Sequence, residues 1–219
     1  MPETLFIEMR KKINLNEINF SALDKLHGKT ISLAAVIQYI NFIIPVKKYL
    51  ENKGMKVIIK KGRNYPAHII GCDSSAFGKN ADNFLLLSDG KFHALNNALE
   101  LDREIYVFNG KNLEKISKED IEKEKRKIKA KLSKFLSSDK IGILVSLKQG
   151  QKKPEPYIYD IIEKLKAKNK KPYVFESDTI YIGEIDNFPD IKVWINTACP
   201  GLALDSSKII NLQDIEEFL

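Results

Sequence analysis

Two cysteines, Cys72 and Cys199, are the only thiols in this chain of 219 residues. Each comes directly after a short apolar segment of strand type, and each begins a loop with small or turn-forming neighbours. A single cysteine is more often an inert buried residue than a ligand. Equivalent positions in two repeated domains, however, would bring both thiols to one shared ligand. Because thiolates alone are the candidate ligands, iron-sulfur chemistry is favoured over catalytic zinc, although two ligands are too few for either centre.

A second set of polar and flexible residues also follows predicted strands. His93 comes after Gly90 at the opening of a predicted helix, where a packing or capping role competes with an acid-base role. Ser146, Gly150 and Gln151 belong to a loop that suits a polar small molecule. The chain contains no GxGxxG or GxxxxGK[ST] loop, no Ser-His-Asp order, no paired-carboxylate motif and no CxxC motif. Residue types and spacing alone therefore lead to an α/β protein with two converging thiols.

Composition excludes several classes of protein. A hydrophobic fraction of 43% over 219 residues supports one ordinary domain or two small ones, and excludes a disordered or fibrous chain. No run of eighteen apolar residues occurs, and the first residues form neither a basic nor an apolar leader, so we expect no membrane segment and a cytoplasmic protein. Two isolated cysteines also exclude a disulfide framework of the secreted type.

The net charge of +7 comes mainly from one segment. Between Lys111 and Lys140 there are 11 Lys or Arg and 6 Asp or Glu, so this window carries +5. Ser117 and Asp120 have the form of a capping box, and apolar residues then recur at helical spacing. The pattern predicts a solvated amphipathic connector helix. A nucleic-acid-binding surface is the less favoured alternative, because arginine, the usual reader of phosphates and bases, is scarce.

Apolar runs bounded by turn residues alternate with helical patterns, which is typical of an α/β protein with mainly parallel sheets flanked by helices. In the first half of the chain, strands are predicted at 31–36, 55–60, 68–71, 84–87 and 104–108, and helices at 37–52 and 92–101. We expect Ile44 on the buried side of the first helix, a kink at Pro45 and a stop at Gly54.

The pattern restarts in the second half, with strands predicted at 141–146, 173–176 and 191–195 and a helix at 157–168. Two similar small domains, 28–137 and 138–219, fit this repetition better than one continuous sheet. The predicted strand at 5–9 has no companion elements within residues 1–27. We interpret it as a remnant edge strand and linker of a missing first domain.

Four segments in register carry a family resemblance. They are HIIGCD at 68–73; DNFL at 82–85, leading to DGKFH at 89–93; GILVS at 142–146, leading to KQGQ at 148–151; and VWINTACP at 193–200. In order and spacing they resemble the radical enzyme family of diphthamide biosynthesis, the archaeal-type 2-(3-amino-3-carboxypropyl)histidine synthases. Each segment alone is weak, but the four together are specific and extend over almost the whole chain from about Ile31 to Leu219.

The resemblance implies an incomplete set of cluster ligands. That family has three similar domains, each contributing one cysteine to a central 4Fe-4S cluster, and it generally works as a dimer. By resemblance Cys72 is the second domain's ligand and Cys199 the third domain's. The first domain, with its cysteine, is then expected on a separate partner chain.

The resemblance also implies a reaction. Three cysteine ligands leave one iron open to S-adenosylmethionine, whose Cγ–S bond breaks after one electron is donated. The resulting 3-amino-3-carboxypropyl radical adds to a histidine of elongation factor 2, so the chain is expected to be part of a transferase that uses a 4Fe-4S cluster. The candidates for lining the S-adenosylmethionine pocket are Ser146, Gly150, Gln151, Gly90 and His93.

The chain departs from the family pattern at two places besides the missing ligand. Gly201 stands where the family usually has arginine, and Lys152 and Lys153 replace an arginine-bearing pattern. These changes leave a second hypothesis open, a non-catalytic subunit that acts as a scaffold or assists reduction of a catalytic partner. A basic nucleic-acid-binding α/β protein is the least favoured hypothesis.

Overall fold

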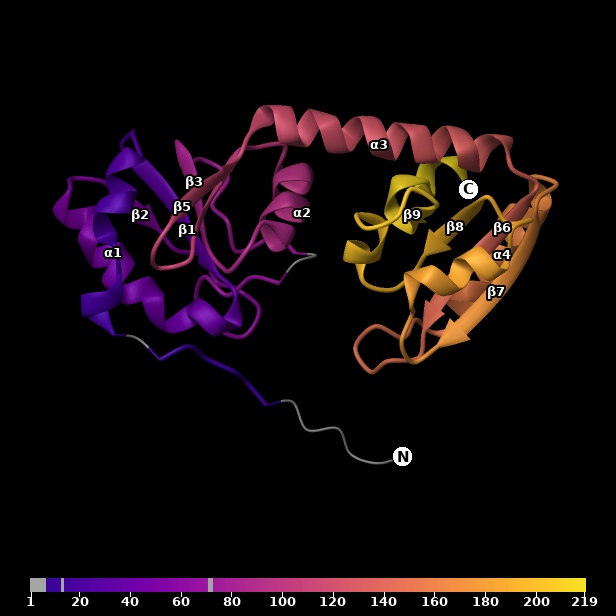
Figure 1. Cartoon of the computed structure of the whole chain (residues 1–219), viewed down its shortest axis with the longest axis horizontal. Coiled ribbons are helices and arrows are strands. Elements are labelled where there is room, and N and C mark those ends of the chain that lie inside the picture. Colours follow the sequence, from indigo (N-terminus) through magenta and orange to yellow (C-terminus); the bar gives the residue numbers. More distant parts are fainter. Residues whose placement is uncertain (1–6, 13, 71–72) are drawn as a thin grey trace. The chain divides into compact units, whose positions relative to one another are not determined.

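The computed structural model describes residues 7–12, 14–70 and 73–219. The chain divides into two compact units, Met1–Glu122 and Lys123–Leu219, each built around its own sheet (Figure 1). The division falls inside the long helix α3 (Lys118–Ser137). Ile121 near the start of α3 packs into the core of the first unit, whereas Phe135 near its end packs into the core of the second. The helix is therefore shared between the units, whereas the domain limits expected from sequence gave all of it to the first.

The first unit is a five-stranded sheet with strand order β2-β1-β3-β4-β5, in which β5 alone runs antiparallel to its neighbour. Helix α1 packs against β1 and β2, and α2 packs against β4 and β5. The elements, in chain order, are the 3-10 turns η1 (Leu15–Glu17) and η2 (Phe20–Lys25), β1 (Thr30–Ala35), the 3-10 turn η3 (Ile37–Phe42), α1 (Ile43–Asn52), β2 (Lys56–Ile58), β3 (Asn83–Leu87), α2 (Phe92–Leu101), β4 (Ile105–Phe108) and β5 (Leu113–Ile116).

The second unit is a four-stranded, fully parallel sheet with strand order β7-β6-β8-β9. Following the end of α3, its elements are β6 (Lys140–Ser146), α4 (Glu155–Ala167), β7 (Lys171–Ser177), η4 (Ile182–Asn187), β8 (Val193–Asn196), η5 (Pro200–Ala203), β9 (Ile209–Asn211), η6 (Leu212–Asp214) and η7 (Glu216–Phe218). Apart from β5, the two sheets have the same order. The first strand lies inside, the second strand lies at one edge, and the third and fourth follow on the other side.

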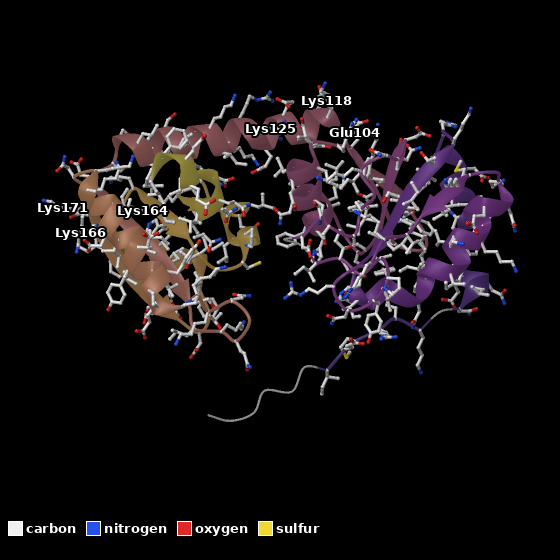
Figure 2. All side chains as sticks on the ribbon, turned by 180° about the vertical axis from the view of Figure 1, so that it is seen from behind. Glu104, Lys118, Lys125, Lys164, Lys166 and Lys171 are labelled. Carbon is white, nitrogen blue, oxygen red and sulfur yellow. The ribbon has the colours of Figure 1, made fainter. Side chains whose placement is uncertain are left out.

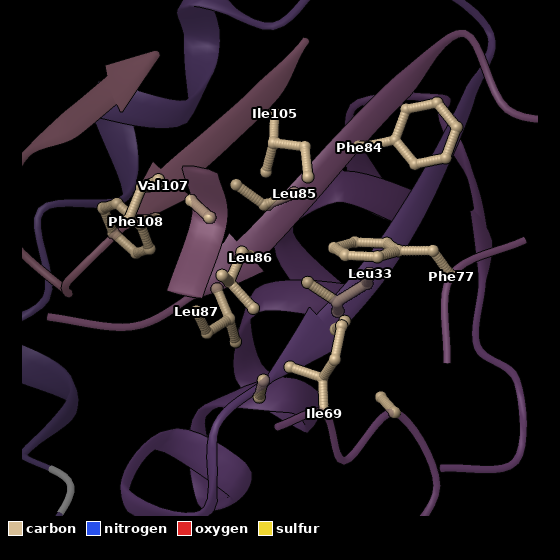
Figure 3. Close-up of a cluster of buried hydrophobic side chains, with 14 of the residues drawn as sticks. Leu33, Ile69, Phe77, Phe84, Leu85, Leu86, Leu87, Ile105, Val107 and Phe108 are labelled. Carbon is tan, nitrogen blue, oxygen red and sulfur yellow. The ribbon is translucent and has the colours of Figure 1, made fainter. Parts of the chain in front are cut away.

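The inner strands β1, β3, β6 and β8 are almost entirely buried, because side chains cover both faces of each sheet there. In the first unit Leu33 of β1 and Leu85 of β3 are fully buried, and Figure 3 shows Ile69 and Phe77 gathered on the same core. In the second unit the fully buried Trp194 of β8 lies against Gly142 of β6, where an added Cβ would lie 2.2 Å from the indole ring. These cores confirm the predicted α/β fold with mainly parallel sheets.

Helix α1 differs from its prediction in phase. The predicted helix at 37–52 is a 3-10 turn, η3, followed by the α-helix, and it ends as predicted before Gly54, which has φ +84°. Ile44, expected on the buried side, is 70% exposed. A 3-10 turn advances 120° per residue instead of 100°, so a face counted with the α-helical period through η3 shifts out of register.

The predicted strand at 5–9 is wrong for the residues that the structure describes. Residues 7–9 have no strand pairing, and residues 5 and 6 lie outside the described residues. Side chains tie this segment down instead. The phenolic hydroxyl of Tyr65 donates to the Glu8 carboxylate at 3.0 Å, and the Arg10 guanidinium lies over the Tyr65 ring at 4.7 Å. A short apolar run alone did not reveal that residues 7–9 have no backbone partner strand.

The predicted strand at 68–71 is reduced to isolated bridges. His68 pairs in parallel with Ala35 at the end of β1, and Ile70 pairs with Asp73. The backbone of His68 is also used in a local turn, since its carbonyl accepts from the Arg63 N–H at 3.0 Å. This turn prevents a regular ladder, and Gly71 and Cys72 lie outside the described residues.

Helix α3 confirms the predicted cap. The Asp120 N–H donates to Ser117 Oγ at 3.1 Å, and the Ser117 N–H donates to the Asp120 carboxylate at 2.9 Å, which closes a capping box. Exposed lysines such as Lys118 on α3 and Lys164 on α4 carry much of the positive charge (Figure 2). Lys131 is an exception, because it is buried. In the part of the chain that the structure describes, no helix is long and apolar enough to cross a membrane.

Candidate functional site

The order of the strands identifies one edge of each sheet as the place for a ligand. In open parallel sheets the crevice lies outside the carboxyl ends of two neighbouring strands whose connections leave in opposite directions. In the second unit these strands are β6 and β8, and in the first unit they are β1 and β3. The loops after these four strands therefore contain the candidate site residues.

Cys199 lies at this crevice edge of the second unit. It follows β8 by three residues and is the cap residue of η5, with extended backbone at φ −65° and ψ 123°. Its thiol is free and half-buried. Its carbonyl accepts two hydrogen bonds, one from Asn196 Nδ2 at 2.8 Å and one from the Leu202 N–H at 3.1 Å. The backbone that carries the sulfur is thus held in place while the thiol stays accessible.

The side chain of Asn196 stabilises this turn through hydrogen bonds. It is the last residue of β8 and is buried, and besides holding the Cys199 carbonyl it accepts from the Ala198 N–H at 3.0 Å. Its amide nitrogen also donates to Asn211 Oδ1 on β9 at 2.8 Å, and Thr197 Oγ1 donates to the Leu144 carbonyl at 2.8 Å. Buried polar groups that are satisfied in this way rigidify their surroundings. Asn196 was not among the residues predicted from sequence, although its place two residues before the turn matches an Asx side chain that caps the backbone.

The loop after β6 contains the other three candidates of this unit. Ser146 is buried, and its Oγ accepts from the Lys148 N–H at 3.2 Å, so it shapes the turn. Gly150 is exposed with φ +84°, and nothing lies within 4 Å of where its Cβ would be. The N–H of the half-buried Gln151 donates to the Lys148 carbonyl at 2.9 Å. Gly150 and Gln151 are therefore open to a ligand, whereas Ser146 supports the loop.

Gly90 and His93 lie at the crevice edge of the first unit, after β3. Gly90 is exposed with φ +69°, and no atom lies within 4 Å of its Cβ position. His93 is half-buried on the first turn of α2, beside Phe92. Burial lowers the pKa of His93 below its usual value, which favours the neutral imidazole at pH 7. A neutral imidazole can donate one hydrogen bond and accept another, and it carries no charge.

A cluster that the sequence did not predict crosses the same edge of the first unit. Lys11 Nζ donates to Asp89 at 2.6 Å and to the hydroxyl of Tyr39, and that hydroxyl donates to Asp89. Burial raises the pKa of Asp89, but the hydrogen bonds from Lys11 and Tyr39 outweigh it and hold the pKa of Asp89 below its ordinary value. The cluster joins residues far apart in sequence, so no local pattern could have predicted it. It fixes the backbone immediately before Gly90.

Cys72 lies outside the described residues, but the chain leading to it can be followed. His68 pairs with Ala35 on the side of β1 away from β3, because Ala35 is already paired with Leu87 of β3. The segment leading to Cys72 thus continues the position of β2 at the edge of the sheet and precedes β3 in the chain. Cys199 instead follows β8, which has the place of β3 in its own sheet. The equivalence of the two cysteines stays a prediction, because Cys72 itself is not among the described residues.

Cys199 is by itself a single candidate ligand and not a complete metal site. Among the described ranges 7–12, 14–70 and 73–219, no group of three or more His, Cys, Asp or Glu side chains could hold a metal ion. Cys199 supplies one soft, accessible donor on a rigid turn, as a single cluster ligand requires. Its unit supplies no further thiol. Any cluster bound through Cys199 needs ligands from elsewhere.

Comparison with known proteins gives a family. The model of the diphthamide synthesis protein family matches residues 2–210 of this chain. The chain belongs to that family. The resemblance carried by the four sequence segments is confirmed.

Curated relatives agree with this assignment. A 2-(3-amino-3-carboxypropyl)histidine synthase of Methanocaldococcus jannaschii is 31% identical over 87% of this chain and 51% of its own length. The protein of the same name from Pyrococcus horikoshii is 24% identical over 92% of this chain and 60% of its own length. The chain thus spans between about half and three fifths of the length of these relatives.

Solved structures show the same fold. The crystal structure of Dph2 from Pyrococcus horikoshii matches with a TM-score of 0.78 at 24% identity, over 91% of this chain and 59% of that chain. The structure of that protein with a 4Fe-4S cluster matches with a TM-score of 0.77 at 23% identity, over the same shares. The arrangement of elements in the diphthamide synthesis chain described here is therefore that of Dph2.

Proposed function

We propose that this chain is the C-terminal part, or a subunit, of a 4Fe-4S enzyme that transfers the 3-amino-3-carboxypropyl group of S-adenosylmethionine to a histidine of elongation factor 2. This transfer is the first step of diphthamide biosynthesis. The observation that carries the proposal is Cys199, an accessible thiol on a rigid turn at the crevice edge of a diphthamide synthesis family chain. The chain spans about half to three fifths of the length of these relatives.

In this proposal Cys72 and Cys199 are two of three cluster ligands, and a separate chain carrying the first family domain supplies the third. A 4Fe-4S cluster, when bound, supplies the electron that cleaves the Cγ–S bond of S-adenosylmethionine. The protein's own contribution is binding and orientation. Gly150 and Gln151 after β6, with Gly90 and His93 after β3, contact S-adenosylmethionine, while Ser146 shapes the loop.

Charge at the first unit's edge suits this substrate. S-adenosylmethionine is a sulfonium cation with a carboxylate and an amine. His93, with its pKa lowered by burial, adds no positive charge that would repel the sulfonium. The carboxylate of Asp89, next to Gly90, stays ionised at neutral pH because its pKa is lowered by Lys11 and Tyr39 in spite of burial. Elongation factor 2 is the macromolecular partner of the assembled enzyme, which we expect to be dimeric.

Anaerobic reconstitution tests the proposal. The purified chain is incubated with iron and sulfide, alone and together with a chain of about 100 residues that carries the first-domain cysteine. We expect a stable cluster, S-adenosylmethionine cleavage and modification of elongation factor 2 only in the mixture. A stable, S-adenosylmethionine-cleaving cluster on this chain alone would contradict the need for a partner. Absence of a cluster in both samples would contradict the proposed function.

The alternative is a non-catalytic subunit that acts as a scaffold or assists reduction in the same complex. It is favoured by the absence of a three-ligand group among the described residues. The double variant C72A/C199A separates the two roles in the assembled complex. Loss of elongation factor 2 modification supports the ligand role, and unchanged modification supports the scaffold.

A further inference from the structure

Helix α3 carries one lysine that is not part of its solvated face. Lys131 is only 5% exposed, on the inward side of the helix between Ile128 and Phe135. Burial lowers the pKa of Lys131, so its position works against its own charge. Burying an ammonium group is unfavourable unless hydrogen bonds satisfy it. Such a group needs a structural reason.

The partner of Lys131 belongs to the turn that carries Cys199. Lys131 Nζ donates to the carbonyl oxygen of Ala203, the last residue of η5. Ala203 is itself buried, so its carbonyl has little access to water. The terminal carbonyls of a helical turn lack partners within the turn, and a cation there is favourable. Lys131 thus closes the carboxyl end of η5.

The opposite end of the same turn is held by Asn196. Its side chain accepts a hydrogen bond from the Ala198 N–H and donates one to the Cys199 carbonyl. Between these two contacts lie only the residues from Cys199 to Ala203. Hydrogen bonds from β8 and from α3 therefore stabilise this turn at its two ends.

We propose that Lys131 is a positioning residue for Cys199, which holds the turn Cys199–Ala203 in the conformation that presents the thiol at the crevice edge. The purpose of this positioning, ligation of a cluster, rests on the proposed function. The hydrogen bond from Lys131 to the turn does not rest on the proposed function, because it positions the thiol in the chain alone. This assigns the basic helix a role in the site, in place of that of a solvated connector.

The first test measures Cys199 itself. In a C72S background Cys199 is the only thiol, and its alkylation rate is followed from pH 6 to pH 10 together with amide exchange of residues 197–204. K131M keeps the length of the side chain but donates no hydrogen bond. Because a loosened turn exposes the half-buried thiol more often, we expect the limiting alkylation rate to rise at least about tenfold, as expected for loss of a hydrogen bond from a charged donor. Faster exchange in this turn alone should accompany it.

K134M is the matched control. Lys134 lies on the same helix and is exposed. It donates to the Ser207 carbonyl at 3.4 Å, outside the turn Cys199–Ala203. We expect its alkylation rate and its exchange in residues 197–204 to match those of the parent. K131Q, which retains an N–H donor of shorter reach, should fall between the parent and K131M. If K131M folds and reacts like the parent, or if K131M fails to fold and K131Q reacts like the parent, the positioning role is refuted.

The second test separates this inference from the proposed function. In the reconstituted complex with the partner chain, we expect K131M to change the electron paramagnetic resonance signature of the cluster and to lower its occupancy, whereas K134M does neither. If the parent complex assembles no cluster but alkylation still responds to K131M, the proposed function fails and the positioning role stands. If the parent complex assembles a cluster but K131M leaves the alkylation rate unchanged, the positioning role fails and the proposed function stands.

Discussion

The two units have the same strand order but hold their crevice edges in different ways. In the second unit buried groups do so: the amide of Asn196 is joined to Asn211 and to the Cys199 turn, and the buried Lys131 donates to Ala203 at the end of that turn. In the first unit a charged and partly exposed cluster of Lys11, Tyr39 and Asp89 does so. The two units thus share the position of the crevice edge but differ in the contacts that stabilise its loops. Added salt and a fall in pH should therefore act mainly on the first edge, where the charged groups are partly exposed.

The largest effect is expected at Gly142, which fixes the packing of the second unit. A Cβ there would lie 2.2 Å from Cε3 of the fully buried Trp194. Overpacking of this kind is expected to cost about 3 kcal/mol in G142A. Urea unfolding of the chain checks this loss. Amide exchange of β1 and β3 should stay unchanged, because these strands belong to the other unit.

G150A is the matched control for this substitution. Its added Cβ meets no atom within 4 Å, but φ is +84°, so only the backbone preference of about 1 kcal/mol is lost. Equal destabilisation by the two variants would contradict the role assigned to the contact between Gly142 and Trp194.

Asn196 comes next, because its side chain makes three hydrogen bonds in a buried place. N196A leaves Asn211 and the Cys199 turn without these partners, and we expect a loss of about 2 to 3 kcal/mol. Unfolding can be followed by the fluorescence of Trp194, the only tryptophan in the chain. The exposed Asn187 on η4 offers a control, since N187A should change stability by less than about 0.5 kcal/mol. The same loss at high and low salt is also expected for N196A.

A smaller, pH-dependent effect is expected at Asp89. Its pKa in the folded protein is lowered, so its contribution is present above the unfolded pKa of about 3.9 and is lost as the pH falls through the folded pKa. D89N should cost about 0.2 to 1 kcal/mol at pH 7 in low salt, the range for exposed ion pairs. Exchange of the loop after β3 should lose its acid dependence in D89N. If the second unit's crevice edge is the one that loosens first in acid, the contrast between the units is wrong.

The smallest effect is expected at Lys11. Besides its side-chain contacts, its backbone N–H donates to the Gln38 carbonyl at 2.8 Å, so K11M keeps part of the attachment. We expect only a few tenths of a kcal/mol in global stability, but clearly faster exchange of residues 7–12 and of the Asp89 loop. The neighbouring Lys12 is exposed, and K12M should leave both segments as they are. Identical exchange rates in K11M and K12M would show that the cluster of Lys11, Tyr39 and Asp89 does not stabilise the edge of the first unit.

Helices and strands with strong local patterns were predicted well. The helix at 92–101 agrees with α2, the strand at 141–146 with β6, and the capping box at Ser117 is present. The strands β5 and β9 were missed for different reasons. β5 is an edge strand whose central residues, Glu114 and Lys115, are exposed, and β9 is only three residues long. Neither gives an apolar run of the length that a strand prediction requires.

The candidate site was predicted in part. Cys199 and the loop after β6 were expected at the carboxyl ends of strands, and they lie there, because strand ends can be read from local patterns. The residues that hold them, Asn196 and Lys131, act through partners up to 72 positions away. A basic helix with a solvated face is the ordinary interpretation of such a charge pattern, and only packing reveals which lysine turns inward.

The sequence by itself determined the α/β class, the family and the edge of the second sheet at which Cys199 emerges, since these depend on local periodicity and on motifs in register. Only the tertiary structure decided the rest. The strand pairing places the segment leading to Cys72 next to β1 on the β2 side, and the packing of α3 brings Lys131 to the Cys199 turn. Pairing and packing join residues distant in the chain, and the hydrogen bonds that select them form only once the sheets are assembled.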